Sequence, residues 1–73
     1  MKKKILILFG NRVKQCRKNL HVSQEAFAEK TGLHRTYMGM IERAEKNITL
    51  ENILKISQGL NLLLSELFKN IDI

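Results

Sequence analysis

The segment SQEAFAEKTGLHRTYMGMIER, residues 23–43, has the pattern of two short helices joined by a sharp turn. Ser23 stands where a hydroxyl caps the first free amides of a helix that we expect over residues 24–30. Gly32 suits the left-handed conformation that ends a helix and turns the chain. A second helix is then expected over residues 35–43, so the stretch predicts a helix, a turn and a helix.

The second of these helices has two unlike faces. At 100° per residue, Met38 and Ile41 lie together on one side, as core residues do. The other side carries a forked donor, a hydroxyl, a bare backbone patch and a thioether. These belong to Arg35, Thr36, Gly39, Met40 and Arg43. Arginine can donate two hydrogen bonds to guanine, and a threonine methyl can pack on the methyl of thymine. This face therefore predicts contacts with the bases of double-stranded DNA through Arg35, Thr36 and Met40, although Met40 is equally well explained as a tolerated surface methionine.

Length and charge set the class of the protein. A chain of 73 residues is expected to form one domain, residues 1–73, with one small core. Its formal charge of +6 indicates either a polyanionic partner, nucleic acid or an acidic membrane surface, or a basic solvated surface that serves solubility, and charge alone does not separate these. The apolar run at residues 5–9 is shorter than a signal segment and far shorter than the ~20 residues of a membrane span. Cys16 is the only cysteine and cannot pair within the chain. We therefore expect a cytoplasmic protein without a membrane partner.

Apolar residues recur at helical spacing outside the central pair as well, which predicts an all-α fold of five helices. The remaining helices are expected over residues 5–19, 50–58 and 64–70. In the first, the apolar stripe is Ile5, Phe9, Val13, Cys16 and Leu20, and in the fourth it is Leu50, Ile53, Leu54 and Ser57, with Gly59 ending the helix.

Several polar residues near the central helices are candidates for contacts with the DNA backbone. His34 is expected either to cap the helix that follows it or to contact a phosphate. Lys46, Asn47 and Thr49 lead into the fourth helix, whose free amides can accept a phosphate, and a simple capped loop is the alternative. The Lys2–Lys4 run either binds the backbone or forms a solvated tail.

Catalytic and metal chemistry are not indicated. No second ligand is spaced to share an ion with His34, so we expect no metal. No cofactor motif, small-molecule site or catalytic set of residues stands at workable spacing, and we do not expect an enzyme.

Residues 23–43 resemble the helix-turn-helix of the XRE/Cro and phage-repressor family. The likeness rests on Gln24 at the start of the first helix, Ala28 at the helix crossing, Gly32 in the turn, and the apolar residues Phe27, Leu33, Met38 and Ile41. It extends over about residues 9–68 and implies a compact five-helix domain like that of the lambda repressor. The RTY and IER motifs within residues 35–43 look most like those of restriction–modification controller proteins, which are small homodimeric autoregulators.

The resemblance also implies roles for single residues. It implies that Arg35 and Thr36 face bases, that Tyr37 contacts the DNA backbone or the narrowed groove, and that Gln24 and Arg43 contact phosphates. For Arg35 and Thr36, the resemblance implies the same base contacts that the helix geometry predicts.

The family pattern also includes an ion pair, and this sequence differs from the pattern at three positions. The resemblance implies that Arg17 and Glu42 meet as a partly buried ion pair. Thr31 stands where the family usually has an apolar residue, Ala44 replaces a frequent glycine, and Leu63 stands where a polar cap normally starts the last helix. We expect the first two departures to weaken turn packing slightly.

The C-terminal segment, about residues 60–73, has more large apolar residues than one short helix can bury in its own chain. They are Leu62, Leu63, Leu64, Leu67, Phe68 and Ile71. One recognition helix reads only about four or five base pairs, so we expect this segment to form the interface of a homodimer that binds a near-palindromic operator, with half-sites ~34 Å apart.

Three biological settings remain open for such a protein. It is expected to be a transcriptional regulator, either a restriction–modification controller or a phage-type repressor. The alternative is an antitoxin-like protein-interaction module with secondary DNA binding. RNA polymerase is a further candidate partner, through the acidic residues Glu25, Glu29 or Glu45.

Overall fold

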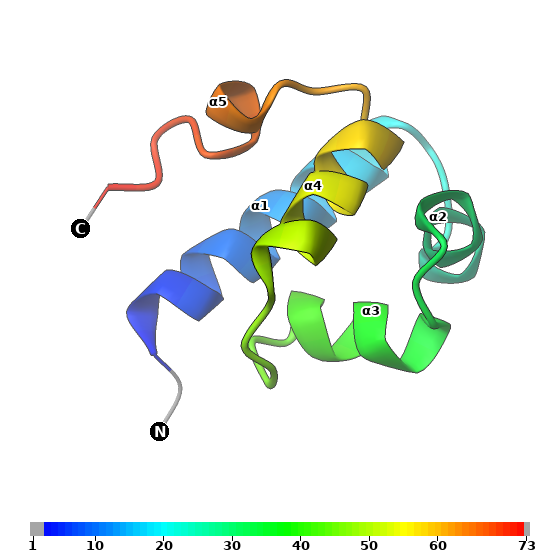
Figure 1. Ribbon diagram of the computed structural model, residues 1–73, viewed down its shortest axis with the longest axis horizontal. Coiled ribbons are helices and arrows are strands. Elements are labelled where there is room, and N and C mark those ends of the chain that lie inside the picture. The colour runs from blue at the N-terminus through cyan, green and yellow to red at the C-terminus, as the bar shows by residue number, and fades with distance from the viewer. Residues whose placement is uncertain (1–2, 73) are drawn as a thin grey trace.

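The computed structural model describes residues 3–72, so Lys2 of the expected lysine run lies outside the described part. Within it the chain forms five α-helices and no strand. The helices are α1 (Lys4–Asn19), α2 (Gln24–Thr31), α3 (Arg35–Glu42), α4 (Leu50–Gly59) and α5 (Leu64–Leu67). The expected all-α fold is confirmed. Figure 1 shows α4 crossing in front of α1, with α2 and α3 at one end and α5 at the top, before the chain runs to the C-terminus on the left.

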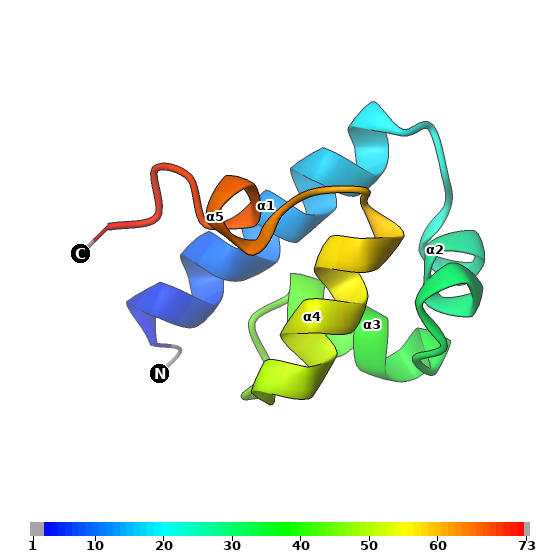
Figure 2. The same cartoon turned by 45° about the horizontal axis from the view of Figure 1, so that its top comes forward.

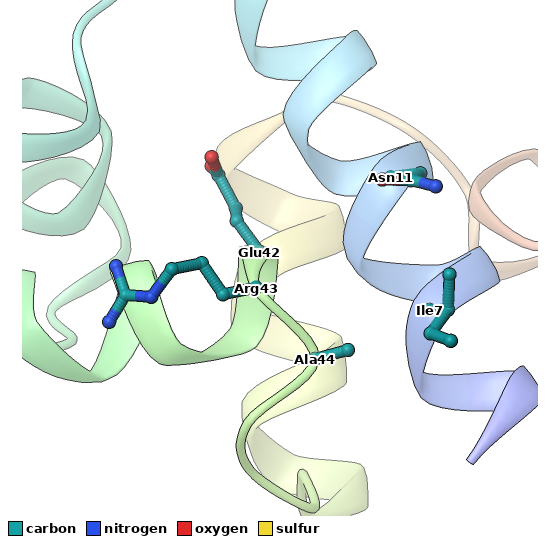
Figure 3. Close-up of a pocket in the computed structure, with 5 residues that line it drawn as sticks. All are labelled: Ile7, Asn11, Glu42, Arg43 and Ala44. Atoms are coloured by element: carbon teal, nitrogen blue, oxygen red, sulfur yellow. The ribbon is translucent and has the colours of Figure 1, made fainter. Parts of the chain in front are cut away.

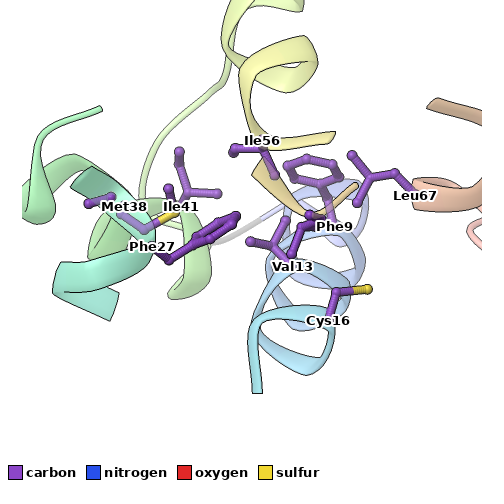
Figure 4. Packing of buried hydrophobic residues seen from close by; sticks show 10 residues of the cluster. Phe9, Val13, Cys16, Phe27, Met38, Ile41, Ile56 and Leu67 are labelled. Atoms are coloured by element: carbon purple, nitrogen blue, oxygen red, sulfur yellow. The ribbon is translucent and has the colours of Figure 1, made fainter. Parts of the chain in front are cut away.

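Side chains from all five helices meet in one core. Val13, Phe27, Met38, Ile56 and Leu67 each have less than 2% of their surface exposed and come from α1, α2, α3, α4 and α5 respectively. Figure 4 shows Leu67 pointing from α5 toward Phe9 of α1. A single-turn helix has almost no stability of its own, so this packing is what holds α5 in place.

Local signals in the sequence correctly mark the ends of the helices. The Ser23 hydroxyl oxygen accepts a hydrogen bond from the Ala26 amide at 3.0 Å, which starts α2. Gly32 has a φ of 78° and ends it in the left-handed conformation. Thr49 accepts a hydrogen bond from the Asn52 amide at 3.2 Å and starts α4. Each cap satisfies an amide that the helix itself leaves unpaired.

The apolar stripe expected in α4 is partly wrong. Leu50 is 84% exposed and Leu54 is 44% exposed, whereas Ile56 is fully buried. Apolar residues occupy two faces of this helix, and only one of them packs on the core. In α1, likewise, Ile5 and Leu20 are about two-fifths exposed at the two ends of the stripe, with 40% and 42% of their surfaces accessible.

Gly59 has a different role from the expected helix stop. It is the last residue of α4 and is buried, with Leu60 following as the cap. A Cβ atom at this position would lie 2.7 Å from Cγ2 of Thr31 and 3.2 Å from the Phe27 ring. The glycine therefore allows α4 to cross close to α2.

Helix α5 is shorter than expected and ends at Leu67 rather than Asn70. The Lys69 amide bonds the Glu66 carbonyl three residues back, and Asn70 adopts a left-handed φ of 65°. These tight turns replace the last helical turn. At the start of the helix, the Leu63 amide donates to the Glu66 carboxylate at 2.8 Å, which forms the one half of a capping box that an apolar residue at position 63 allows.

The two departures that were expected to weaken turn packing differ in their effect. The buried Thr31 hydroxyl donates to the Ala28 carbonyl at 2.9 Å and accepts from the Leu33 amide at 3.2 Å, so it strengthens the turn rather than weakening it. Ala44 is buried with a left-handed φ of 60°, a conformation that costs more for a residue with a Cβ atom than for glycine. Figure 3 shows its side chain pointing toward α1, where Ile7 lies.

Candidate nucleic-acid interface

Helix α3 lies at the outer edge of the domain, at the bottom of Figure 1. Met38 and Ile41 anchor one face of it, with 0% and 2% of their surfaces exposed. On the opposite face Arg35 and Thr36 are exposed and Met40 is half-buried. The core thus fixes the helix from one side and leaves donor groups on the other, as a helix that enters a DNA major groove requires.

His34 caps the start of this helix. Its Nδ1 accepts a hydrogen bond from the Thr36 amide at 3.1 Å. When Nδ1 accepts, the proton of the neutral imidazole is on Nε2, and the side chain is exposed. One ring nitrogen therefore caps the helix, and the other remains a donor that suits a phosphate oxygen; the phosphate contact stays a prediction.

Arg35 is the first residue of α3 and forms an ion pair with Glu25 of α2. Nη1 of Arg35 donates to Oε2 of Glu25 at 2.8 Å, and the two side chains are 63% and 70% exposed. The pair lies at the surface and joins the first turn of α2 to the first residue of α3. The guanidinium is thus held beside the exposed face of α3 without being buried.

The backbone at Gly39 is covered rather than bare, which corrects the expectation for this position. A Cβ atom on Gly39 would lie 3.0 Å from Nη1 of Arg43 and 3.3 Å from Oε1 of Gln24. Nε and Nη2 of Arg43 donate to the Glu45 carboxylate at 3.1 Å each. Figure 3 shows the Arg43 side chain lying back along α3. These hydrogen bonds raise the pKa of Arg43, which keeps it cationic.

Arg17 and Glu42 form a buried ion pair between α1 and α3. Arg17 donates from Nε and Nη2 to the two carboxylate oxygens, at 2.7 and 3.0 Å, and from Nη1 to the Val22 carbonyl at 2.9 Å. The side chains are 11% and 2% exposed. The hydrogen bonding that Arg17 donates to the Glu42 carboxylate raises the pKa of Arg17. Gln24 donates to the same carboxylate at 3.0 Å, so this expected phosphate contact is also part of the buried cluster.

Tyr37 is half-buried, and its hydroxyl accepts a hydrogen bond from the side-chain amide of Asn52 at 3.0 Å. Sequence reasoning missed Asn52, because the contact spans 15 residues and no local pattern signals it. Asn52 lies in the first turn of α4, so this bond ties the outer face of α3 to the start of α4. Tyr37 is thereby held in place by a contact within the domain.

The loop between α3 and α4 lies at the same edge of the domain as α3 (Figure 1). Lys46 and Asn47 are exposed there, and the Thr49 hydroxyl caps α4. Figure 2 shows the first turn of α4 beside α3. The expected contacts to the DNA backbone therefore gather on one side of the molecule.

The residues expected at a dimer interface divide into two groups. Leu63 and Leu64 are 69% and 45% exposed, whereas Leu62, Phe68 and Ile71 are half-buried against the core. Phe68 stacks on Phe9 with ring centroids 5.3 Å apart. Leu67, which was expected in the interface, is instead fully buried in its own chain, because α5 inserts it beside Phe9.

An apolar hollow lies between α4 and α5. It is lined by Leu50, Glu51, Ile53, Leu54, Leu64 and Phe68. Leu50 and Leu54, which were expected in the core, therefore belong to this surface. Their signal was present in the sequence as a second apolar face of α4.

No group of three or more His, Cys, Asp or Glu residues in positions 3–72 is placed to hold a metal ion. Over the same residues, none of the helices combines the length and the apolar character that a membrane crossing needs.

A capped helix, a turn with a left-handed glycine, and an exposed second helix with donor side chains define a helix-turn-helix DNA-binding domain. The model of the helix-turn-helix family matches residues 13–67. The chain belongs to this family, whose members are DNA-binding transcriptional regulators rather than enzymes.

Control proteins are among its relatives in sequence. The chain is 48% identical over 69 residues to control protein C.MunI of a Mycoplasma species, covering 93% of each chain. It is 46% identical over 61 residues to control protein C.BamHI of Bacillus amyloliquefaciens, covering 82% of this chain and 75% of that one.

Solved structures agree with this relationship. The restriction–modification controller protein C.AhdI of Aeromonas hydrophila has a TM-score of 0.84 at 41% identity, covering 86% of this chain and 96% of that one. The controller protein C.Esp1396I has a TM-score of 0.88 at 29% identity, covering 93% and 88%. The likeness therefore extends over nearly the whole fold.

Proposed function

We propose that the protein is a cytoplasmic homodimer that binds a near-palindromic operator and regulates the transcription of a restriction–modification system. One observation carries the proposal. Helix α3 presents Arg35 and Thr36 on a face that the core does not use, while Met38 and Ile41 fix its orientation. The similarity to C.MunI and C.AhdI, which are named as control proteins, supports the restriction–modification setting.

Within the proposed complex, Arg35 and Thr36 contact base edges and Met40 packs beside them. Polar side chains around α3 and the loop after it contact the DNA backbone, namely Gln24, His34, Tyr37, Arg43, Lys46, Asn47 and Thr49. Contacts to phosphates give affinity that falls steeply with salt, and contacts to bases give specificity.

Arg35→Ala is expected to lose operator preference while keeping the fold. A bidentate contact to guanine contributes about 1–3 kcal/mol of discrimination, so affinity for the operator should fall by that amount while affinity for unrelated DNA changes little. Fluorescence anisotropy with an operator duplex and a scrambled duplex measures both. Lys14→Ala is the matched control, because it removes one exposed positive charge from α1. An unchanged ratio of the two affinities in Arg35→Ala would show that Arg35 does not contact bases.

The dimer is proposed from the hollow between α4 and α5. Leu50, Leu54 and Leu64 are 84%, 44% and 45% exposed and lie around the same hollow. Apolar side chains gathered on one exposed surface favour a partner that covers them. A second copy of the chain presents the same surface, and two-fold symmetry brings the two together as a palindromic operator requires.

Leu54→Asp is expected to give a folded monomer with operator affinity reduced roughly tenfold or more, because one bound subunit no longer helps to hold the other. Leu54 is nearly half exposed, so aspartate there costs the monomer little. Leu20→Asp is the control, since Leu20 is 42% exposed at the far end of α1. Sedimentation velocity gives the oligomeric state. A Leu54→Asp protein that still sediments as a dimer would rule out this surface.

In the alternative of an antitoxin-like module, the same hollow would bind a different protein. Sedimentation of the purified chain alone separates the two, because only the homodimer needs no second component. For the proposed contact with RNA polymerase, Glu29 is the remaining acidic candidate, since Glu25 and Glu45 are engaged in ion pairs with arginines.

A further inference from the structure

We propose that Glu25 is a specificity-determining residue that acts through Arg35. It holds one nitrogen of the guanidinium and so presents the opposite edge to the bases, and its negative charge penalises pairing of Arg35 with a phosphate. This inference rests on the proposed contact of Arg35 with bases and names the residue that positions it.

The geometry of the pair leaves a two-donor edge available. Glu25 accepts from Nη1 of Arg35 at 2.8 Å, and among residues 3–72 no other acceptor bonds to this side chain. A guanidinium binds guanine through two adjacent N–H groups, which contact O6 and N7. The edge formed by Nε and Nη2 satisfies that need while the bond to Glu25 remains. Arg35 can therefore contact a guanine without giving up its partner.

Arg43, at the other end of α3, is held in a different way. Its Nε and Nη2 both donate to Glu45, so the edge that would bind a base is the one that the carboxylate occupies. Its Nη1 lies over Gly39. Of these two arginines, Arg35 is thus the one whose partner leaves a forked edge for recognition.

The pair should discriminate between kinds of DNA contact because it lies at the surface. Ion pairs this exposed contribute about 0–1 kcal/mol to folding, so Glu25 has little role in stability. Base edges are neutral and tolerate a carboxylate next to the arginine, whereas a phosphate close to Arg35 is also close to Glu25 and is repelled by it. Glu25 therefore weakens unspecific complexes more than the specific one.

The test compares two affinities for five variants. The probes are a duplex recovered by selection from a randomised library and a scrambled duplex of the same length. We expect Glu25→Gln to lower the ratio of specific to unspecific affinity about fivefold, mainly because unspecific binding becomes stronger. Glu25→Asp keeps the charge but shortens the reach to Arg35, so it should also lower the ratio. Glu29→Gln removes the same charge one turn along α2 and should leave the ratio unchanged.

The remaining variants separate this proposal from the role of Arg35 itself. In Arg35→Ala the ratio should fall, and adding Glu25→Gln to it should cause no further loss. If Arg35→Ala lowers the ratio but Glu25→Gln has no more effect than Glu29→Gln, Glu25 has no role in specificity and the role of Arg35 stands. If Arg35→Ala leaves the ratio unchanged, the proposed base contact fails and this inference fails with it. Thermal unfolding of each variant shows that the fold is retained.

Discussion

Glu42→Ala is expected to destabilise the domain by about 3–5 kcal/mol, because it leaves the Arg17 guanidinium buried without its carboxylate. Both hydrogen bonds from Arg17 to Glu42 would be lost, together with the one from Gln24. A domain of 73 residues has only a few kcal/mol of stability to lose, so most of the variant should be unfolded under ordinary conditions.

Urea unfolding followed by circular dichroism measures this effect. Glu45→Ala is the matched control, because it also breaks an arginine–glutamate pair, but one whose side chains are 55% and 40% exposed. The control should change the free energy of unfolding by less than about 1 kcal/mol. A Glu42→Ala protein as stable as this control would show that the buried pair does not support the fold. Loss of DNA binding in Glu42→Ala would report unfolding and not recognition.

Gly10→Ala is expected to destabilise the domain by about 2–3 kcal/mol, although alanine favours a helix more than glycine by about 1 kcal/mol. A Cβ atom at Gly10 would lie 2.6 Å from the Ile41 carbonyl oxygen and 2.9 Å from that of Glu42. Both atoms belong to the backbone at the end of α3, so neither can move without shifting the helix away from α1. The result would be a poorly packed core and a displaced recognition helix.

Gly39→Ala provides the comparison for this prediction. There the new Cβ atom would meet only the ends of the Arg43 and Gln24 side chains, which can rotate away. It should therefore leave the melting temperature unchanged or raise it. If Gly10→Ala melts at the same temperature as Gly39→Ala, the close crossing of α1 and α3 is not required for stability.

Helix caps and turns depend only on neighbouring residues, and the sequence predicted them best. The caps at Ser23 and Thr49 and the left-handed turn at Gly32 each need only a few residues in order, and all three are present. The core face of α3 followed from helical geometry, because Met38 and Ile41 are buried as expected, whereas the burial of Gly39 under the Arg43 and Gln24 side chains did not.

Features that depend on packing between distant segments were harder to predict. Helix α4 has two apolar faces, and periodicity does not say which one meets the core, so Leu50 and Leu54 were assigned to the wrong side. The burial of Leu67 depends on how α5 returns to α1. The Arg35–Glu25 pair and the bond between Asn52 and Tyr37 join separate helices, so no sequence spacing reveals them.

We expect a dimer of this chain to recognise a specific DNA sequence through α3. The experiment is a selection of bound duplexes from a fully randomised library at near-physiological salt. The expected result is one motif with two inverted half-sites whose centres lie about one helical turn, ~34 Å, apart. Recovery of no shared motif, with binding that depends only on salt, would contradict the claim.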